Sequence, residues 1–365
     1  MREIRGRIVT GERVVRGRVR FAGTILAVEE DPAAPEWPLV TPGFVDLHVH
    51  GGAGADVMEG EAAVRHMAAF HLRHGTTALL ATTVCAPRET LLRAAAAVGA
   101  VVRAPGREEA RVLGLHLEGP FLDPRALGAQ PPHTRRDDPD LARALLAAGP
   151  VRVVTLAPEA DPRGRLLALF RQHGVRVQIG HTRCDYAAAR AMLEAGAAGF
   201  THLYNAMSGL HHREPGAVGC ALAHARYAEI IPDLHHVHPA AIHAARRAIP
   251  GLYAVTDAVA AAGMPDGPHR LGGRTVRRRG ERVELEDGTL AGSVLTTDRA
   301  FARLLAIGLD PLTAVRMVAT VPADYLGLAD RGRIAPGLRA DLLVFEAGPE
   351  LARIHLGGAP LDPAQ

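Results

Sequence analysis

Short apolar segments that read as β-strands recur along the middle of this 365-residue chain, and amphipathic helical patterns separate them. The eight expected strands are residues 43–47, 78–82, 112–117, 151–156, 175–179, 199–201, 228–231 and 252–255. The clearest expected helices are residues 60–74, 88–103, 162–173 and 185–195. Apolar strands that alternate with amphipathic helices are typical of a parallel sheet covered on both faces. Eight such units predict an α/β fold, a TIM-like (β/α)8 barrel, with a doubly wound open sheet as the alternative.

Both ends of the chain read differently, as short strands interrupted by Gly and Pro. The expected strands are residues 7–9, 14–15, 18–21 and 24–28 near the start, and 340–345 and 353–356 near the end. Two strand-rich ends around an α/β middle predict a small β-sandwich domain formed by both termini. The expected organisation is therefore residues 1–40 and 333–365 in the β-domain, with the barrel at residues 41–332.

Composition excludes several classes of protein. Hydrophobic residues make up 48% of the chain and charged residues 22%, which is typical of a globular protein, and the net charge of +3 argues against a general nucleic-acid binder. No apolar run is long enough to span a bilayer, and residues 1–15 are too charged for a signal peptide. The sparse cysteines Cys85, Cys184 and Cys220 indicate reduced thiols. We therefore expect a cytoplasmic protein with neither a nucleic-acid nor a membrane partner.

Potential metal ligands stand at the ends of five expected strands. In chain order they are His48, His50, Glu118, His181, His202 and Asp257. The carboxyl ends of barrel strands meet at one mouth, so these side chains should share one site. His48 and His50 lie two residues apart in a strand and therefore face the same side. Imidazole and carboxylate ligands predict a divalent metal, zinc or iron first, with cobalt and manganese as alternatives.

Several longer motifs carry a resemblance to known enzymes. Residues 42–51, Pro-Gly-Phe-Val-Asp-Leu-His-Val-His-Gly, resemble the first-strand signature of the amidohydrolase superfamily, and residues 332–342 resemble that superfamily's return into its small β-domain. Four further segments resemble the N-acetylglucosamine-6-phosphate deacetylase family; they are residues 116–121, 201–207, 213–216 and 290–293. The resemblance runs over nearly the whole chain.

The resemblance implies a metal-dependent hydrolase of amino-sugar catabolism that converts N-acetylglucosamine 6-phosphate to glucosamine 6-phosphate and acetate. In that family Glu118, His181 and His202 would hold the principal metal. His48 and His50 would hold a second one, so one or two metals are expected per subunit. Asp257 would take a proton from the attacking water and pass it to the departing amine.

The absence of lysine from the chain bears on how two metals could be bridged. Many binuclear amidohydrolases use a carboxylated lysine, so a bridge here would have to be a carboxylate, and Glu118 is the candidate. An N-acetylgalactosamine-6-phosphate deacetylase is the nearest alternative. Another amidohydrolase, such as a cyclic amidase or a deaminase, and a metal-free scaffold of the same fold are more distant ones.

The family's substrate contacts carry over to a second set of residues. Arg213 matches the phosphate-binding arginine, His236 matches a sugar-phosphate contact, and Gln130 stands where many members have a histidine that polarises the scissile carbonyl. The remaining expected contacts are Ala129, Asn205, Ala206, Leu290, Ala291 and Gly292. In the family some of these residues come from the neighbouring subunit, so a homodimer is implied.

Two departures from the family pattern leave questions open. The usual Asp-Gly-x-His motif here has Leu234 in place of the glycine, followed by His235, so either His235 or His236 could reach the ligand. His133 could also substitute for the histidine that Gln130 replaces.

Overall fold

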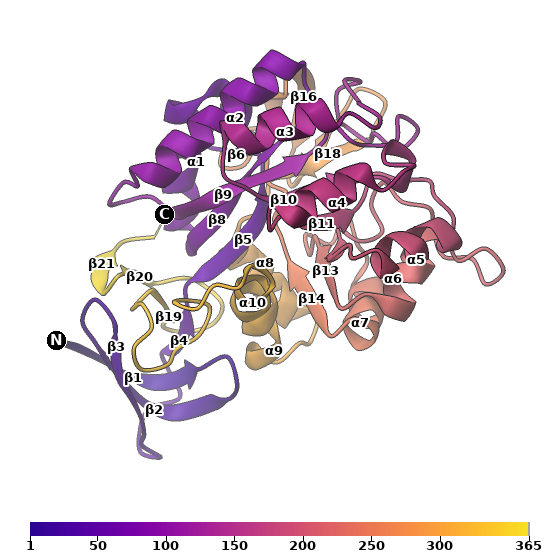
Figure 1. Cartoon of the computed structure of the whole chain (residues 1–365). Coiled ribbons are helices and arrows are strands. Elements are labelled where there is room, and N and C mark those ends of the chain that lie inside the picture. Colours follow the sequence, from indigo (N-terminus) through magenta and orange to yellow (C-terminus); the bar gives the residue numbers. More distant parts are fainter. Residues whose placement is uncertain (364–365) are drawn as a thin grey trace.

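The computed structural model describes residues 1–363, and eight parallel strands form its central sheet (Figure 1). Their order is β14-β13-β12-β11-β10-β9-β8-β5, which follows the chain from one end to the other. The strands are β5 (Phe44–Val49), β8 (Thr76–Thr83), β9 (Arg111–Glu118), β10 (Val151–Leu156), β11 (Arg176–Ile179), β12 (Gly199–Phe200), β13 (Tyr227–Ile230) and β14 (Gly251–Ala254). Every strand expected in the middle of the chain has a counterpart, so the predicted (β/α)8 barrel is confirmed.

Contacts after β14 bring the two outer strands together. The N–H of Asp257 donates to the carbonyl oxygen of His48 in β5 over 2.9 Å. Asp46 in β5 is fully buried and accepts a hydrogen bond of 2.6 Å from the Thr256 hydroxyl. These bonds close the barrel at the carboxyl ends of its strands, where the candidate ligands lie.

Seven helices connect successive barrel strands, and an eighth follows the last of them. They are α1 (Glu61–Arg73), α2 (Arg88–Arg103), α3 (Pro139–Ala148), α4 (Arg165–Gln172), α5 (Tyr186–Glu194), α6 (Gly216–His224), α7 (Pro239–Ala248) and α8 (Thr297–Ala306). Helix α2 buries Leu91, Ala95 and Val98, whose spacing places them on one face toward the sheet. Within residues 1–363, no helix has both the length and the apolar character needed to cross a membrane.

Shorter elements complete the barrel. After β5 the chain forms a two-stranded sheet of β6 (Gly51–Gly52) and β7 (Ala55–Asp56), and the 3-10 helix η1 (Val57–Glu59) follows. A second 3-10 helix, η2 (Pro158–Ala160), follows β10. After α8 come α9 (Pro311–Val315), the π-helix η3 (Arg316–Thr320) and α10 (Val321–Leu326).

An antiparallel sheet that the eight-unit pattern does not predict lies between β14 and α8. Its strands are β15 (Gly267–Leu271), β16 (Arg274–Arg279), β17 (Arg282–Glu284) and β18 (Leu290–Ser293). The N–H of Ser293 donates to the carbonyl oxygen of Asp257 over 2.8 Å. This bond holds β18 at the mouth of the barrel.

Both ends of the chain pair into one separate sheet, as expected, with the order β21-β20-β19-β4-β1-β2-β3 (Figure 1). Its strands are β1 (Arg2–Val9), β2 (Val14–Phe21), β3 (Ile25–Glu30), β4 (Leu39–Pro42), β19 (Leu342–Phe345), β20 (Arg353–Leu356) and β21 (Ala359–Leu361). The central pairing joins β4 to β19, so strands from the two ends lie side by side. Because of this pairing, we propose that residues 1–40 and 333–365 form the small β-domain and that residues 41–332 form the barrel domain. Residues 364 and 365 lie outside the described part of the chain.

Three buried phenylalanines join the terminal sheet to the barrel. Phe345 of β19 lies 5.1 Å from Phe301 of α8 and 6.4 Å from Phe44 of β5, between ring centroids. We expect Phe345→Ala to lower the free energy of unfolding by about 3–5 kcal/mol because it leaves a cavity between the two domains. Phe345→Leu is the control and should cost less than about 1.5 kcal/mol. Urea denaturation followed by circular dichroism measures both, and equal stabilities for Phe345→Ala and the wild type would contradict this role.

Candidate metal centre

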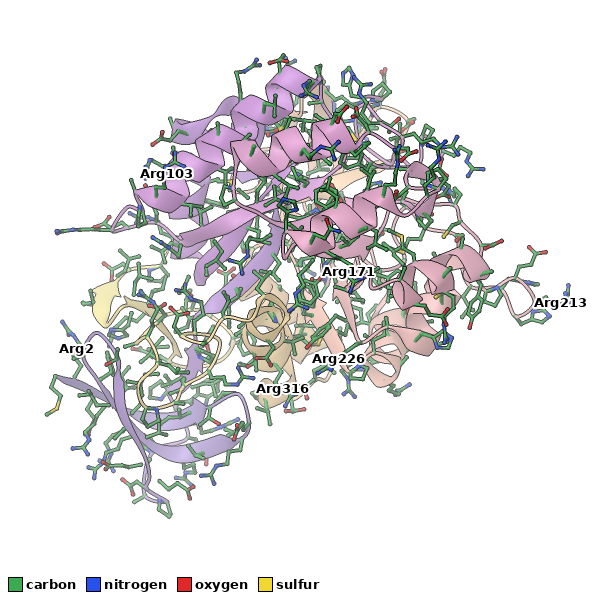
Figure 2. The ribbon with its side chains drawn as sticks, in the orientation of Figure 1. Arg2, Arg103, Arg171, Arg213, Arg226 and Arg316 are labelled. Carbon is green, nitrogen blue, oxygen red and sulfur yellow. The ribbon has the colours of Figure 1, made fainter. Side chains whose placement is uncertain are left out.

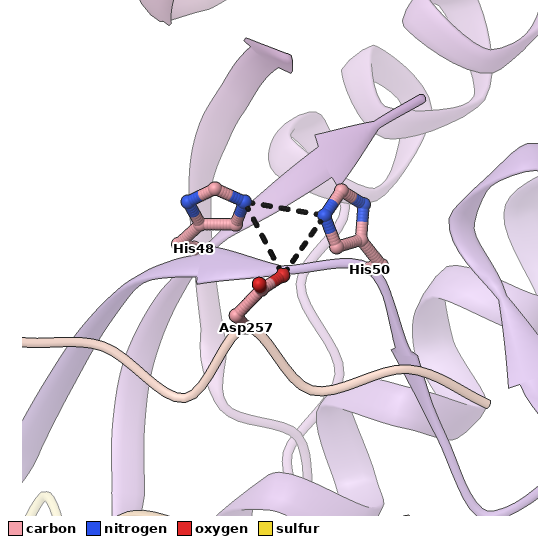
Figure 3. Close-up of side chains that lie close together, drawn as sticks. All are labelled: His48, His50 and Asp257. Carbon is pink, nitrogen blue, oxygen red and sulfur yellow. Dashed lines mark hydrogen bonds and ion pairs between the residues drawn. The ribbon is translucent and has the colours of Figure 1, made fainter. Parts of the chain in front are cut away.

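The six predicted ligands meet at the barrel mouth, in two groups of three. In the first group, Nε2 of His202 and Nε2 of His181 lie 2.8 and 3.1 Å from Oε1 of Glu118. In the second group, Oδ1 of Asp257 lies 3.2 Å from Nε2 of His50 and 3.5 Å from Nε2 of His48 (Figure 3).

Glu118 links the two groups. Its Oε1 lies 3.3 Å from Nε2 of His48, and its Oε2 lies 3.2 Å from Nε2 of His50. Oε1 thus lies between the first group and His48, and Oε2 faces His50 of the second group, so the carboxylate is placed where a bridging ligand would be.

The outer nitrogens of the imidazoles test whether this cluster suits a metal. In three of the histidines Nδ1 faces an acceptor. Nδ1 of His48 lies 2.9 Å from a carboxylate oxygen of Glu229, that of His50 lies 3.1 Å from the carbonyl oxygen of Thr82, and that of His181 lies 2.8 Å from the carbonyl oxygen of Ala126. A proton on each Nδ1 leaves the Nε2 lone pair directed into the cluster. Such anchoring of the outer nitrogen is typical of histidines that bind a metal. The donor set therefore fits a divalent cation.

Both candidate acids are ionised at neutral pH. Burial alone would raise the pKa of Glu118, but the imidazoles of His48 and His181 hold that pKa well below its usual range. Burial also opposes ionisation of Asp257, yet His48 and His50 lower its pKa to about 2. Asp257 can therefore accept a proton at the mouth of the barrel.

Backbone strain concentrates at this mouth. Five non-glycine residues that follow β11, β12 and β14 have left-handed backbone conformations; they are His181 (φ 48°), His202 (φ 26°), Tyr204 (φ 81°), Ala206 (φ 51°) and Asp257 (φ 51°). Strain of this kind costs of order 1–3 kcal/mol per residue and clusters at functional sites.

A cavity of about 340 Å³ opens above the cluster. Most of the predicted site residues line it; they are His50, Glu118, Ala129, Gln130, His181, His202, Asn205, Ala206, His236, Asp257, Leu290 and Gly292. His48 is fully buried beneath this set. The buried Ala291 is not among the lining residues, because its neighbours in β18 occupy the wall instead.

The side chain of Gln130 is held on both sides. Its Oε1 accepts the N–H of Cys85 over 2.8 Å, and its Nε2 donates to Oε2 of Glu118. The amide therefore orients the carboxylate of Glu118, and polarisation of the carbonyl by Gln130 stays a prediction. His133 is exposed and lies away from the cavity lining, so it does not take the place of the missing histidine.

The structure separates the two neighbouring histidines. His236 lines the cavity, and its Nδ1 lies 2.6 Å from Oδ2 of Asp233, whereas His235 points toward Glu281 at 3.5 Å. Burial lowers the pKa of His236, but the hydrogen bond to Asp233 and the negative charges of Asp233 and Asp257 together outweigh burial, so the pKa is raised. Leu234 has φ 65°, which explains why a glycine is usual at this position.

Arg213 does not line the cavity of its own chain. It lies at the end of a loop that projects from the barrel (Figure 2), and its guanidinium contacts Nε2 of His212 at 2.9 Å. The expected contact of Arg213 with a phosphate is therefore not made within the cavity of its own chain.

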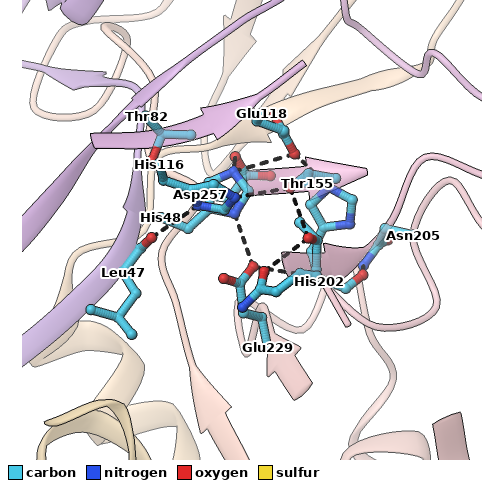
Figure 4. Close-up of polar contacts among 12 residues, drawn as sticks. Leu47, His48, Thr82, His116, Glu118, Thr155, His202, Asn205, Glu229 and Asp257 are labelled. Atoms are coloured by element: carbon cyan, nitrogen blue, oxygen red, sulfur yellow. Dashed lines mark hydrogen bonds and ion pairs between the residues drawn. The ribbon is translucent and has the colours of Figure 1, made fainter. Parts of the chain in front are cut away.

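Glu229 in β13 is a functional residue that sequence reasoning missed. Its buried Oε2 lies 2.9 Å from Nδ1 of His48 and 3.2 Å from the backbone nitrogen of His202 (Figure 4). Its Oε1 accepts a hydrogen bond of 3.3 Å from the Tyr253 hydroxyl. Glu229 thus contacts one member of each ligand group. The sequence signal that could have identified Glu229 is a glutamate inside an otherwise apolar strand.

We expect Glu229→Gln to weaken zinc binding by the His48 group about 10–100-fold, because the carboxylate that fixes the His48 tautomer is lost. Competition with a chromophoric chelator measures the affinity, and circular dichroism checks the fold. Tyr253→Phe is the control, since it keeps the bond from His48 to Glu229 and should change the affinity much less. Equal affinity in Glu229→Gln and wild type would rule out this role.

Comparison with known proteins places the chain in a family. Residues 39–360 match the model of the Amidohydrolase family. The N-acetylgalactosamine-6-phosphate deacetylase of Escherichia coli O157:H7 is 38% identical over 348 residues, which cover 92% of each chain. The N-acetylglucosamine-6-phosphate deacetylase of Bacillus subtilis (strain 168) is 36% identical over 331 residues, which cover 87% of this chain and 83% of that one.

Solved structures agree with the sequence relatives. An N-acetyl-D-glucosamine-6-phosphate deacetylase mutant from Mycobacterium smegmatis, in complex with N-acetyl-D-glucosamine-6-phosphate, is similar with a TM-score of 0.92 at 34% identity. That match covers 98% of this chain and 97% of the other. The chain therefore belongs to the amidohydrolase family and, within it, to the N-acetylglucosamine-6-phosphate deacetylases and their near relatives.

Proposed function

We propose that this protein hydrolyses the acetamide of N-acetylglucosamine 6-phosphate to glucosamine 6-phosphate and acetate, in the catabolism of amino sugars. The observation that carries the proposal is the meeting of Glu118, His181 and His202 with Asp257 at one cavity. Relatives that are named for this reaction and that match most of the chain support the proposal.

The residues of the cavity divide the reaction between them. Metal bound by the cluster supplies an acidified water and a Lewis acid for the carbonyl. Asp257, ionised and only slightly exposed, accepts the proton that the attacking water loses. The same carboxyl group then gives this proton to the nitrogen as the C–N bond breaks, which yields the neutral amine and acetic acid. The acetic acid loses its own proton to solvent at neutral pH and leaves as acetate.

Zinc or iron suits the donor set first, and cobalt or manganese has the same ligand preferences. Glu118, His181 and His202 would hold one metal, and His48 and His50 a second one beside Asp257. The two oxygens of Glu118 face both groups, which supports two metals per subunit.

A homodimer would complete the phosphate end of the site. His236 and the backbone at Asn205 and Ala206 line the cavity from within the chain, and Arg213 would reach the cavity of the partner subunit. The three cysteines are buried and free, which supports the cytoplasm as the location.

An N-acetylgalactosamine-6-phosphate deacetylase is the second candidate, because a relative of that name is 38% identical over 92% of the chain. Acetate release from both N-acetylhexosamine 6-phosphates and from unphosphorylated N-acetylglucosamine separates the candidates. We expect the glucosamine phosphate to react fastest, and activity to be lost with a chelator and restored by zinc. Absence of acetate release from all three substrates in the metal-loaded enzyme would refute the function.

Mixing two impaired variants, assayed at a substrate concentration well below the KM of Arg213→Ala, tests the shared site. Asp257→Asn should lower kcat at least about 100-fold through loss of the proton acceptor, and Arg213→Ala should raise KM for the phosphorylated substrate. If each subunit supplies its Arg213 to the partner's site, a dimer of one Asp257→Asn subunit and one Arg213→Ala subunit has one site in which both residues are intact. Exchange at equal amounts should therefore restore about a quarter of wild-type activity. If mixing restores nothing while the variants do exchange subunits, Arg213 does not serve the partner's site.

A further inference from the structure

An arginine that no motif singled out, Arg183, stands in the wall of the cavity. It belongs to the loop between β11 and α5. Arg183 also lines a second hollow, of about 620 Å³, together with Arg213 and the loop around it. Arg183 therefore lies between the metal centre and the surface that carries Arg213.

Hydrogen bonds fix Arg183 in this position. Glu159 accepts the backbone N–H of Arg183 over 2.9 Å and the hydroxyl of Thr182 over 2.6 Å. The guanidinium itself reaches two carbonyl oxygens, that of Met207 at 3.3 Å and that of Arg125 at 3.5 Å. A guanidinium has five N–H donors, so most of the Arg183 donors are left for a ligand.

The loop of Arg183 is joined to the segment that would bind the phosphate. The N–H of Thr182 donates to the carbonyl oxygen of Ala206 over 3.0 Å, and the N–H of Ser208 donates back to Thr182 over 3.1 Å. Ala206 has a left-handed backbone, and its own N–H has no backbone acceptor among residues 1–363. A cationic side chain and a free backbone donor thus occur together at this end of the cavity.

Charge distinguishes Arg183 from the other arginine of the cavity wall. Arg125 is neutralised, because its guanidinium contacts Asp123 at 2.8 Å and Glu159 at 3.5 Å. Within residues 1–363, the side-chain hydrogen bonds of Arg183 go to backbone carbonyls and none goes to a carboxylate. A phosphate monoester carries a charge of about −1.5 to −2 at neutral pH, and guanidinium groups bind it with paired N–H donors.

We infer that Arg183 binds the 6-phosphate within its own subunit and sets the preference for phosphorylated amino sugars. The inference rests on the proposed function, since it assigns the phosphate of that substrate to Arg183 in addition to His236. The preference would then depend on each chain's own arginine as well as on the partner's Arg213.

Calorimetry with glucose 6-phosphate, which has the phosphate but no acetamide, tests the inference on the metal-loaded enzyme. We expect Arg183→Ala to weaken binding about 10–100-fold, the equivalent of one lost charged hydrogen-bond pair. Arg183→Lys should recover part of the loss. Arg143→Ala is the matched control, because Arg143 is an exposed arginine of α3 that pairs with Asp140, and its removal should change nothing.

Kinetics give the second measurement. Arg183→Ala should raise KM for N-acetylglucosamine 6-phosphate with kcat nearly unchanged, and should leave kcat/KM for unphosphorylated N-acetylglucosamine unaltered. The inference would be overturned if Arg183→Ala bound glucose 6-phosphate as tightly as the wild type, or if the wild type did not bind it. It would also be overturned if kcat/KM fell equally for phosphorylated and unphosphorylated N-acetylglucosamine. Binding of glucose 6-phosphate needs no turnover, so an enzyme without deacetylase activity would refute the proposed function and still leave Arg183 tested.

Discussion

The carboxylate of Glu118 is the point on which the two halves of the metal centre depend. It is 2% exposed, and Nε2 atoms of four histidines lie within 3.3 Å of its oxygens. A buried charge is costly unless its partners are held in good geometry. Because those partners come from the ends of β5, β11 and β12, the site forms only when the barrel itself is closed.

The layers around this carboxylate have different tasks. Above it, the cavity leaves space for a substrate and exposes Asp257 slightly. Beneath it, Glu229 and the carbonyl oxygens of Thr82 and Ala126 hold the outer nitrogens of the histidines. Two of these supports, Thr82 of β8 and Glu229 of β13, belong to barrel strands, and the third, Ala126, belongs to the loop after β9.

The phosphate end of the site is built differently. Its candidate residues His236, Ala206 and Arg183 lie on separate loops, and Arg213 projects away from the chain that carries it. Binding a charged group needs donors and a positive field over a wider area than catalysis does. Such a surface can be assembled from several loops, and from two subunits, without disturbing the metal centre.

Sequence patterns were enough to predict the barrel, the pairing of the two termini and the six candidate ligands. Strand periodicity and the convergence of parallel strand ends are regular enough to be predicted from residue order. Three-dimensional contacts were needed to show that His236 rather than His235 faces the cavity, that Gln130 is hydrogen-bonded to Glu118, and that Arg213 lies outside the cavity of its own chain. These outcomes depend on loop conformation, such as the left-handed backbone of Leu234, and on contacts between residues far apart in the chain. The buried Glu229 was missed for the same reason, since its importance comes from His48, 181 positions away in the sequence.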